Sequence, residues 1–151
     1  MNSSMLITSP SFENNAPIPK KFTCEGGDLN PELQIQNVPE DTKSLALIVH
    51  DPDSPTPGGF THWVLWNINP ATGVIKEESV PPGSVEGVNG AGRIGYMGPC
   101  PGSGTHRYEF RLYALRRTLG LAGGSSMKEL EEAIAPNLLA EALLVGSYKK
   151  S

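Results

Sequence analysis

Three apolar segments of the chain have the pattern of β-strands. Residues 44–50 are mostly aliphatic and are bounded by prolines on both sides, as expected for a buried strand. Residues 63–68 have the same character. Over residues 107–113 polar and apolar side chains alternate, so this strand is expected to have one buried face and one solvent-facing face. The pattern predicts a protein rich in β-sheet.

One helix is predicted towards the C-terminus. Ser126 and Glu129 form a capping box, in which each side chain accepts a hydrogen bond from an otherwise unpaired amide at the helix start. Apolar residues then recur at helical spacing over residues 130–134. Pro136 lacks an amide donor and clashes with the preceding turn, so the helix is expected to end or kink near Ala135.

Two further segments have a weaker pattern. Residues 137–148 favour a helix by propensity as far as residue 144, while residues 143–148 fit a last strand equally well. Residues 83–104 are rich in glycine and form the one long irregular segment, of a kind that is usually functional inside a compact domain. No repeat or linker divides the sequence, so residues 1–151 are expected to form a single domain.

Composition agrees with many turns and short strands. The chain of 151 residues contains 17 glycines and 14 prolines and has a net charge of -4, with no stripe of basic residues that would bind nucleic acid. It shows no signal peptide and no apolar run long enough to cross a bilayer, which predicts a soluble cytoplasmic protein. Cys24 and Cys100 have no CxxC spacing; a pair of free thiols is the default prediction, and one disulfide is the alternative.

The first candidate for chemistry is the acidic segment at residues 51–55. Its carboxylates follow a predicted strand and lie among prolines that stiffen the turns, and we expect the Ser54–Pro55 bond to be cis. The competing interpretation is an Asx-turn, in which an aspartate only caps its own backbone. A calcium loop is excluded, because Thr56 stands where the loop needs glycine and His62 where it needs glutamate.

Two histidines are placed alike. His62 and His106 each directly precede a predicted strand, and neighbouring strands would bring both imidazoles close to Asp51. The glycine-rich residues 98–104 can expose backbone amides, which together with imidazole N–H groups and the Tyr108 hydroxyl would surround an anion. The alternative is two ordinary surface histidines beside a loop that binds nothing.

A dinucleotide-binding motif is excluded. Residues 90–95 match GxGxxG, but this fingerprint requires a helix that opens at the glycines. Pro99 and Pro101 follow too closely for such a helix to form. We regard the match as accidental.

Taken together, residues 51–55, 62–63 and 98–108 strongly resemble the signature of the phosphatidylethanolamine-binding (Raf kinase inhibitor-like) family. The first segment is similar to its DPDxP box and the last to its GPxPxGxHRY box. Further likeness runs from residues 22–31 to residues 144–148, so the resemblance covers nearly the whole chain and is greatest to the bacterial and archaeal branch.

The resemblance implies a mostly β fold, with a large central antiparallel sheet, a smaller second sheet and a few peripheral helices. The C-terminus would then be a short helical turn followed by a strand. The family's pocket binds phosphate-like and carboxylate groups without a cofactor or a metal. By position its lining residues here are Asp51, Phe60, His62, Gly98, Pro99, His106 and Tyr108.

The mechanism implied is recognition of a small anionic or zwitterionic ligand without turnover. Asp51 would accept a hydrogen bond from His62 or His106 and fix its tautomer, or would face the amine of a zwitterion. If both histidines donate, affinity should rise as the pH falls through about 6.5.

Two other classes of function remain open. Some family members are described as inhibitors of serine proteases or kinases, and microbial relatives are often homodimers. The other class is an enzyme, in which Asp51, His62 and His106 would form a two-histidine, one-carboxylate metal site or Cys100 with His106 would supply a thiol nucleophile. The chain also ends directly after the last predicted strand, without the C-terminal helix of animal relatives, so lipid binding and kinase regulation are not carried over.

Overall fold

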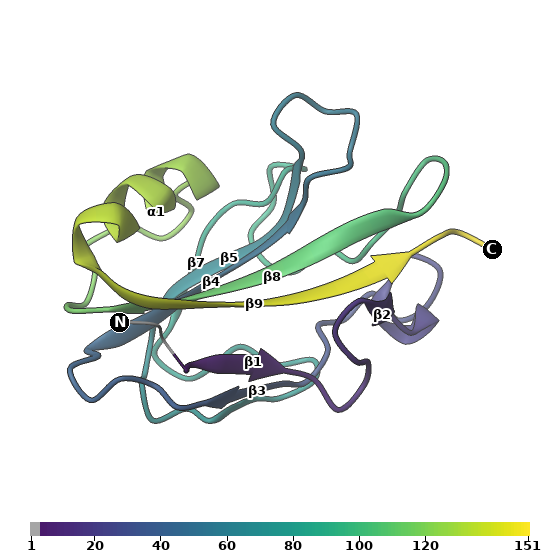
Figure 1. The fold of residues 1–151 in the computed structure, drawn as a ribbon. Coiled ribbons are helices and arrows are strands. Elements are labelled where there is room, and N and C mark those ends of the chain that lie inside the picture. The colour runs from purple at the N-terminus through teal and green to yellow at the C-terminus, as the bar shows by residue number, and fades with distance from the viewer. Residues whose placement is uncertain (1–3) are drawn as a thin grey trace.

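The computed structural model describes residues 4–151 as two β-sheets with one α-helix (Figure 1). The larger sheet has six strands in the order β2-β9-β8-β4-β5-β7 and the smaller has three in the order β1-β3-β6. Every pairing is antiparallel except that of β2 with β9. The fold implied by the family resemblance is therefore confirmed.

The element bounds are as follows. The larger sheet contains β2 (Ala16–Pro17), β4 (Ser44–Asp51), β5 (Phe60–Ile68), β7 (Val85–Glu86), β8 (His106–Leu115) and β9 (Leu138–Tyr148). The smaller sheet contains β1 (Leu6–Thr8), β3 (Leu33–Gln36) and β6 (Val74–Ile75). The helices are α1 (Met127–Ile134) and two 3-10 turns, η1 (Lys20–Phe22) and η2 (Ala135–Asn137).

The larger sheet is covered on both faces. Figure 1 shows α1 over one face and the small sheet, with β1 and β3, over the other. One apolar cluster, which includes Leu47, Phe110 and Leu144, fills the space between the two sheets. A second cluster, which includes Ile48 and Leu130, lies under the helix. Because both of its faces are covered, all eight residues of the central strand β4 are buried.

The predicted helix is confirmed in detail. The Ser126 side chain accepts a hydrogen bond from the Glu129 amide, and the Glu129 carboxylate accepts one from the Ser126 amide. The α-helix ends at Ile134, and Pro136 lies in the 3-10 turn that follows. In the undecided C-terminal segment, Asn137 ends the 3-10 turn η2 and the rest is strand β9, as the family resemblance implied. None of the helices in residues 4–151 is long and apolar enough to cross a bilayer.

Several sequence expectations are corrected. Strand β5 begins at Phe60, so His62 lies inside a strand rather than before it, and His106 is the first residue of β8. Cys24 and Cys100 form a disulfide, so the default prediction of free thiols is wrong. The Ser54–Pro55 bond is trans, so the expected cis bond is also wrong.

Candidate functional site

Three strand ends meet at one end of the larger sheet. Because β4 runs antiparallel to both β5 and β8, its last residue, Asp51, pairs with the first residue of β5, Phe60, and its side chain reaches His106 at the start of β8. A cavity of about 400 Å³ opens at this point. It is lined by Asp51, Ser54, Pro55, Phe60, His62, Met97, Gly98, Cys100, Pro101, Gly102, His106 and Tyr108.

A β-bulge turns His62 towards the cavity. The pairing register of β4 with β5 shifts between Val49 and His50, so that β5 contains one extra residue there. In a regular strand successive side chains point to opposite faces, whereas a bulge lets two neighbours share one face. His62 therefore lines the cavity although its neighbour Trp63 packs in the core between the sheets.

Each oxygen of the Asp51 carboxylate has its own partner. Oδ1 accepts the Asp53 amide at 2.8 Å, which is the Asx-turn of the competing interpretation, and Oδ2 lies 2.7 Å from Nδ1 of His106. The predicted link between Asp51 and an imidazole is thus confirmed, and His106 is the residue that makes it. Since Nδ1 donates to the carboxylate, Nε2 of His106 is left for a ligand.

His62 is held by the neighbouring loop instead. Its Nδ1 lies 2.5 Å from the Met97 carbonyl oxygen and must donate to it, and the Met97 amide donates to the His62 carbonyl at 2.9 Å. Burial lowers the pKa of the His62 imidazole below its ordinary value, because the charged form loses its hydration. The neutral ring then presents Nε2 as an acceptor, so His62 donates to an anion only after protonation.

Tyr108 lies between the two imidazoles. Its ring centroid is 5.2 Å from that of His62 and 6.4 Å from that of His106. The hydroxyl is buried and makes no hydrogen bond of normal geometry with the described residues, although the backbone amide of Cys100 lies near it. Burial and the charge of Asp51 raise the pKa of Tyr108, so its hydroxyl stays protonated and remains a donor.

The loop before β8 forms the opposite wall of the cavity. The Gly98 amide donates to Asp28 Oδ1 at 2.8 Å, and a Cβ at Gly98 would meet the Phe22 carbonyl oxygen at 2.4 Å, so only glycine fits there. The Pro99 carbonyl accepts the Cys24 amide at 3.1 Å, and the disulfide joins Cys24 to Cys100 next to it. This loop is therefore fixed to the segment that follows η1.

An ion pair joins Asp53 and Arg107, which are sequence neighbours of cavity-lining residues. Asp53 accepts hydrogen bonds from the Arg107 amide, Nε and Nη2, at 2.8 to 2.9 Å. These bonds hold the pKa of Asp53 at about 2. The turn after β4 is thereby tied to the start of β8.

Six of the seven residues predicted to form the pocket line this one cavity: Asp51, Phe60, His62, Gly98, His106 and Tyr108. Pro99 does not line it, because its carbonyl faces Cys24. The sequence analysis did not select the other lining residues: Ser54, Pro55, Met97, Cys100, Pro101 and Gly102. All of these except Met97 lie inside the two family boxes, and Met97 directly precedes the second, so adjacency was the available signal.

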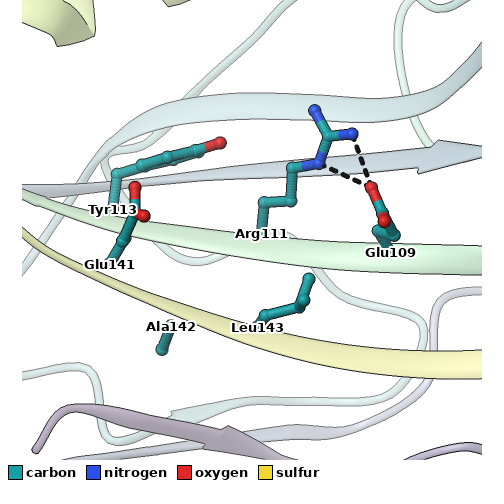
Figure 2. A pocket seen from close by; sticks show the side chains of 6 residues that line it. All are labelled: Glu109, Arg111, Tyr113, Glu141, Ala142 and Leu143. Atoms are coloured by element: carbon teal, nitrogen blue, oxygen red, sulfur yellow. Dashed lines mark hydrogen bonds and ion pairs between the residues drawn. The ribbon is translucent and has the colours of Figure 1, made fainter. Parts of the chain in front are cut away.

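A second hollow lies on the outer face of β8 and β9 (Figure 2). The β8 residues that line this hollow, Glu109, Arg111 and Tyr113, alternate along the strand with residues that face the core. The hollow therefore opens on the face of the sheet opposite the cavity. Figure 2 shows Arg111 and Glu109 pointing towards each other, and the two form an ion pair. The only cation among the lining residues is therefore already neutralised, which makes this hollow a poor anion site.

The described residues do not provide a metal centre or a thiol nucleophile. Within residues 4–151, no group of three or more His, Cys, Asp and Glu side chains is arranged to hold a metal ion. Nδ1 of each cavity histidine is already bonded to a protein oxygen. Cys100 is in a disulfide and has no thiol in this form, so the structure contradicts the alternative in which Cys100 acts with His106 as a nucleophile.

Comparisons with known proteins agree with this architecture. A family model described as phosphatidylethanolamine-binding protein matches residues 8–149. The UPF0098 protein PH1269 of Pyrococcus horikoshii is 48% identical over 96% of this chain and 77% of its own length. A UPF0098 protein of Methanothermobacter thermautotrophicus is 45% identical over 97% of this chain and 99% of its own.

Solved structures show the same fold. The crystal structure of CT736 from Chlamydia trachomatis, described as a homologue of phosphatidylethanolamine-binding protein, has a TM-score of 0.94 and 39% identity, with full coverage of both chains. Escherichia coli YbcL, described as a new member of the mammalian family, has a TM-score of 0.92 and 29% identity over 99% of this chain and all of its own.

The fold and the cavity define a two-sheet β protein with a polar pocket at the strand ends. The chain belongs to the phosphatidylethanolamine-binding protein family. Membership supports a ligand-binding or regulatory role in general terms.

Proposed function

We propose that this protein binds a small anionic or zwitterionic ligand, with a phosphate-like or carboxylate group, in the cavity at the strand ends. The observation that carries the proposal is the convergence of buried polar side chains on one hollow. Asp51, His62, His106 and Tyr108 come from three strands and are only 3%, 4%, 9% and 1% exposed. Burying such groups costs free energy, which a fold rarely sustains around a cavity without a use for them.

The polar groups of the cavity would make different contacts with the ligand. The Tyr108 hydroxyl and the Cys100 amide offer hydrogen atoms to an anion, and protonated His106 donates from Nε2 while Asp51 holds its other nitrogen. Neutral His62 accepts a hydrogen bond, which suits the acidic proton of a monoester or the amine of a zwitterion. Phe60, whose ring centroid lies 4.9 Å from that of His62, adds an apolar wall.

The test is titration of the purified protein with inorganic phosphate, by calorimetry, in wild type and in Tyr108→Phe. Losing one hydrogen bond to a charged group should weaken binding by about tenfold or more. The fold should not suffer, because the hydroxyl that is removed has no normal partner in the protein. Tyr113→Phe is the matched control: Tyr113 lies on the same strand but faces the outer hollow. Equal affinity in the two variants would contradict the proposal.

We propose binding without catalysis, with no cofactor and no metal. The support is that Nδ1 of each cavity histidine is held by a protein oxygen and that Cys100, in the disulfide form, carries no thiol. Turnover of ester or phosphate substrates by the purified protein, abolished in a His106→Asn variant, would contradict this part of the proposal.

Regulation of a partner protein is the second candidate, either as a modulator or as an inhibitor of a protease or a kinase. The observation that favours a protein contact is the outer hollow of about 420 Å³, which Tyr113 and Leu143 both line and where Leu143, opposite Arg111 on β8, is 54% exposed (Figure 2). Inhibition assays against purified serine proteases and kinases test for such a partner.

The same face of the sheet is our candidate for a homodimer contact. Light scattering on wild type and Leu143→Asp tests for the dimer.

We further propose that residues 1–151 act as one domain, in the cytoplasm and without nucleic acid. The support for one domain is that both apolar clusters pack on the same sheet. A disulfide is uncommon in a reducing cytoplasm, so the Cys24–Cys100 bond fits this compartment only if it responds to the redox state. Trapping of free thiols in intact cells tests this point.

A further inference from the structure

The disulfide between Cys24 and Cys100 is part of the cavity wall. Cys100 lines the cavity, while Cys24 lies just beyond η1, outside it. The two residues are 76 positions apart in the sequence, and their Cα atoms are 5.5 Å apart. Both residues are solvent-exposed, unlike the polar side chains that face the cavity, so a reagent in solution can reach the bond.

The disulfide lies at the boundary between the buried part and the exposed part of the loop. On its N-terminal side, Gly98 and Pro99 are buried and are hydrogen-bonded to Asp28 and Cys24. On its C-terminal side, Pro101 is buried but residues 102–105 are all exposed, and the Cβ side of both glycines there is open space. The disulfide thus fixes the loop at the point where it leaves its packed part.

The position of Cys100 matters to the groups that would meet a ligand. Its backbone amide is the polar group near the buried Tyr108 hydroxyl, and its neighbours Pro101 and Gly102 also line the cavity. Releasing Cys100 from Cys24 would remove the covalent link and leave this wall held by the buried Pro101 and by the hydrogen bonds at Met97, Gly98 and Pro99. The donors that surround an anion would then be less ordered before binding, which costs affinity.

We propose that the Cys24–Cys100 disulfide is a redox site that controls ligand affinity: the oxidised form holds the loop in its binding arrangement, and reduction by a dithiol loosens it. This inference rests on the proposed function, because it concerns regulation of that same cavity.

The chemistry is ordinary thiol–disulfide exchange. A thiolate of the dithiol attacks one sulfur of the bond, and the other cysteine leaves as a thiolate and takes up a proton. The second thiol of the reagent then attacks the mixed disulfide and releases the remaining cysteine. The protein gains two electrons and two protons as two thiols, and the dithiol is oxidised to its own disulfide.

The test compares phosphate binding by the oxidised protein, by protein reduced with dithiothreitol, and by reduced protein after reoxidation. If reduction lowers the population of the binding arrangement to about a tenth, the apparent affinity falls by about tenfold. Reoxidation should restore it. Hydrogen exchange supplies a readout that needs no ligand: the Gly98 amide, which donates to Asp28, and the Cys24 amide, which donates to Pro99, should exchange faster after reduction, while the amides of β4 should not change.

A double variant, Cys24→Ser with Cys100→Ser, separates the bond from other effects of the reagent. It should bind phosphate as weakly as the reduced protein, and dithiothreitol should not change its affinity. Circular dichroism in each state checks that the sheet persists. Loss of the sheet signal on reduction would mean global unfolding and would overturn the proposed local control.

The other outcomes are also decisive. Equal phosphate affinity in the oxidised and reduced protein, with both thiols shown to be free, overturns this inference and leaves the proposed function standing. Absence of phosphate binding in the oxidised protein overturns the proposed function, and this inference falls with it.

Discussion

At the scale of single residues, the site depends on which nitrogen of each imidazole is already occupied. Nδ1 of His106 faces the Asp51 carboxylate, and Nδ1 of His62 faces the Met97 carbonyl oxygen. Both rings therefore present Nε2 to the cavity, as acceptors when neutral and as donors when protonated. Two histidines that look equivalent in the sequence differ in their supporting partner, a carboxylate for one and a neutral carbonyl for the other.

The first prediction concerns anion binding and pH. Sulfate affinity should rise as the pH falls below about 6.5, because burial lowers the pKa of His62 and its Nε2 donates to an anion only once the ring is protonated. Sulfate is the probe because it does not itself titrate there. Calorimetry on wild type and His62→Asn checks this, and the variant should lose the dependence on pH. A flat profile in wild type would contradict the assigned role of His62.

The second prediction concerns stability and His62. Its pKa is lowered by burial in the native protein, so below about 6.5 the unfolded chain takes up a proton that the native protein does not. The free energy of unfolding should therefore fall as the pH falls from about 6.5 towards the native pKa, and should level off below it. Urea unfolding of wild type and His62→Asn at several pH values measures this. The free energy of unfolding should fall with decreasing pH more steeply in wild type than in His62→Asn. Parallel curves for the two proteins would contradict the prediction.

At the scale of elements, the site is built from strand ends and from the loop that packs against them. Strand β4 is central and has both faces covered, so the neighbours that pair with it are fixed in register. The loop before β8 depends on close backbone approach at Gly98, where a side chain would overlap the Phe22 carbonyl oxygen. Correct placement of the cavity wall is therefore a matter of steric fit as well as of hydrogen bonds.

The third prediction tests this fit with Gly98→Ala. The added methyl group would lie 2.4 Å from the Phe22 carbonyl oxygen, so the loop must shift, at a cost of about 1–3 kcal/mol in the free energy of unfolding. Phosphate affinity should fall as well, because Gly98 lines the cavity. Gly120→Ala is the control, since a Cβ there has nothing within 4 Å. Thermal unfolding and calorimetry measure both effects, and equal stability of the two variants would show that the contact is not restrictive.

At the scale of the whole molecule, the chain is closed by contacts between distant segments. The disulfide joins residues 76 positions apart, and β9 at the C-terminal end pairs with β2 near the N-terminal end. A cross-link of this span stabilises the native protein mainly by limiting the freedom of the unfolded chain. It lies beside the cavity, so global stability and local order depend on the same bond.

The fourth prediction is the effect of this bond on global stability. Reduction, or the double serine variant, should lower the free energy of unfolding by about 2–4 kcal/mol. Urea unfolding with and without dithiothreitol measures the change, and the reagent should not affect the double variant. A loss near zero would mean that the unfolded chain is not restricted by the bond.

The sequence by itself determined the type of the strongly patterned elements and six of the residues that line the cavity. Alternation over residues 107–113, the capping box at Ser126 and the aliphatic run that became β4 are local patterns, and local patterns follow from backbone geometry and burial. The family resemblance located six residues of the cavity, four of them inside its two boxes, because the matching segments fall at the ends of β4, β5 and β8.

Tertiary structure decided what depends on long-range contact. The bulge that turns His62 to the cavity arises from the register of β5 against β4, which no local pattern specifies. The partners of His62 and His106 lie 35 and 55 positions away. The disulfide needs its two Cα atoms about 5.5 Å apart, a distance that sequence spacing cannot supply. Hydrogen bonds and a disulfide between residues far apart in the sequence form only in the folded chain. The sequence had nevertheless already singled out Asp51, both cavity histidines and both cysteines.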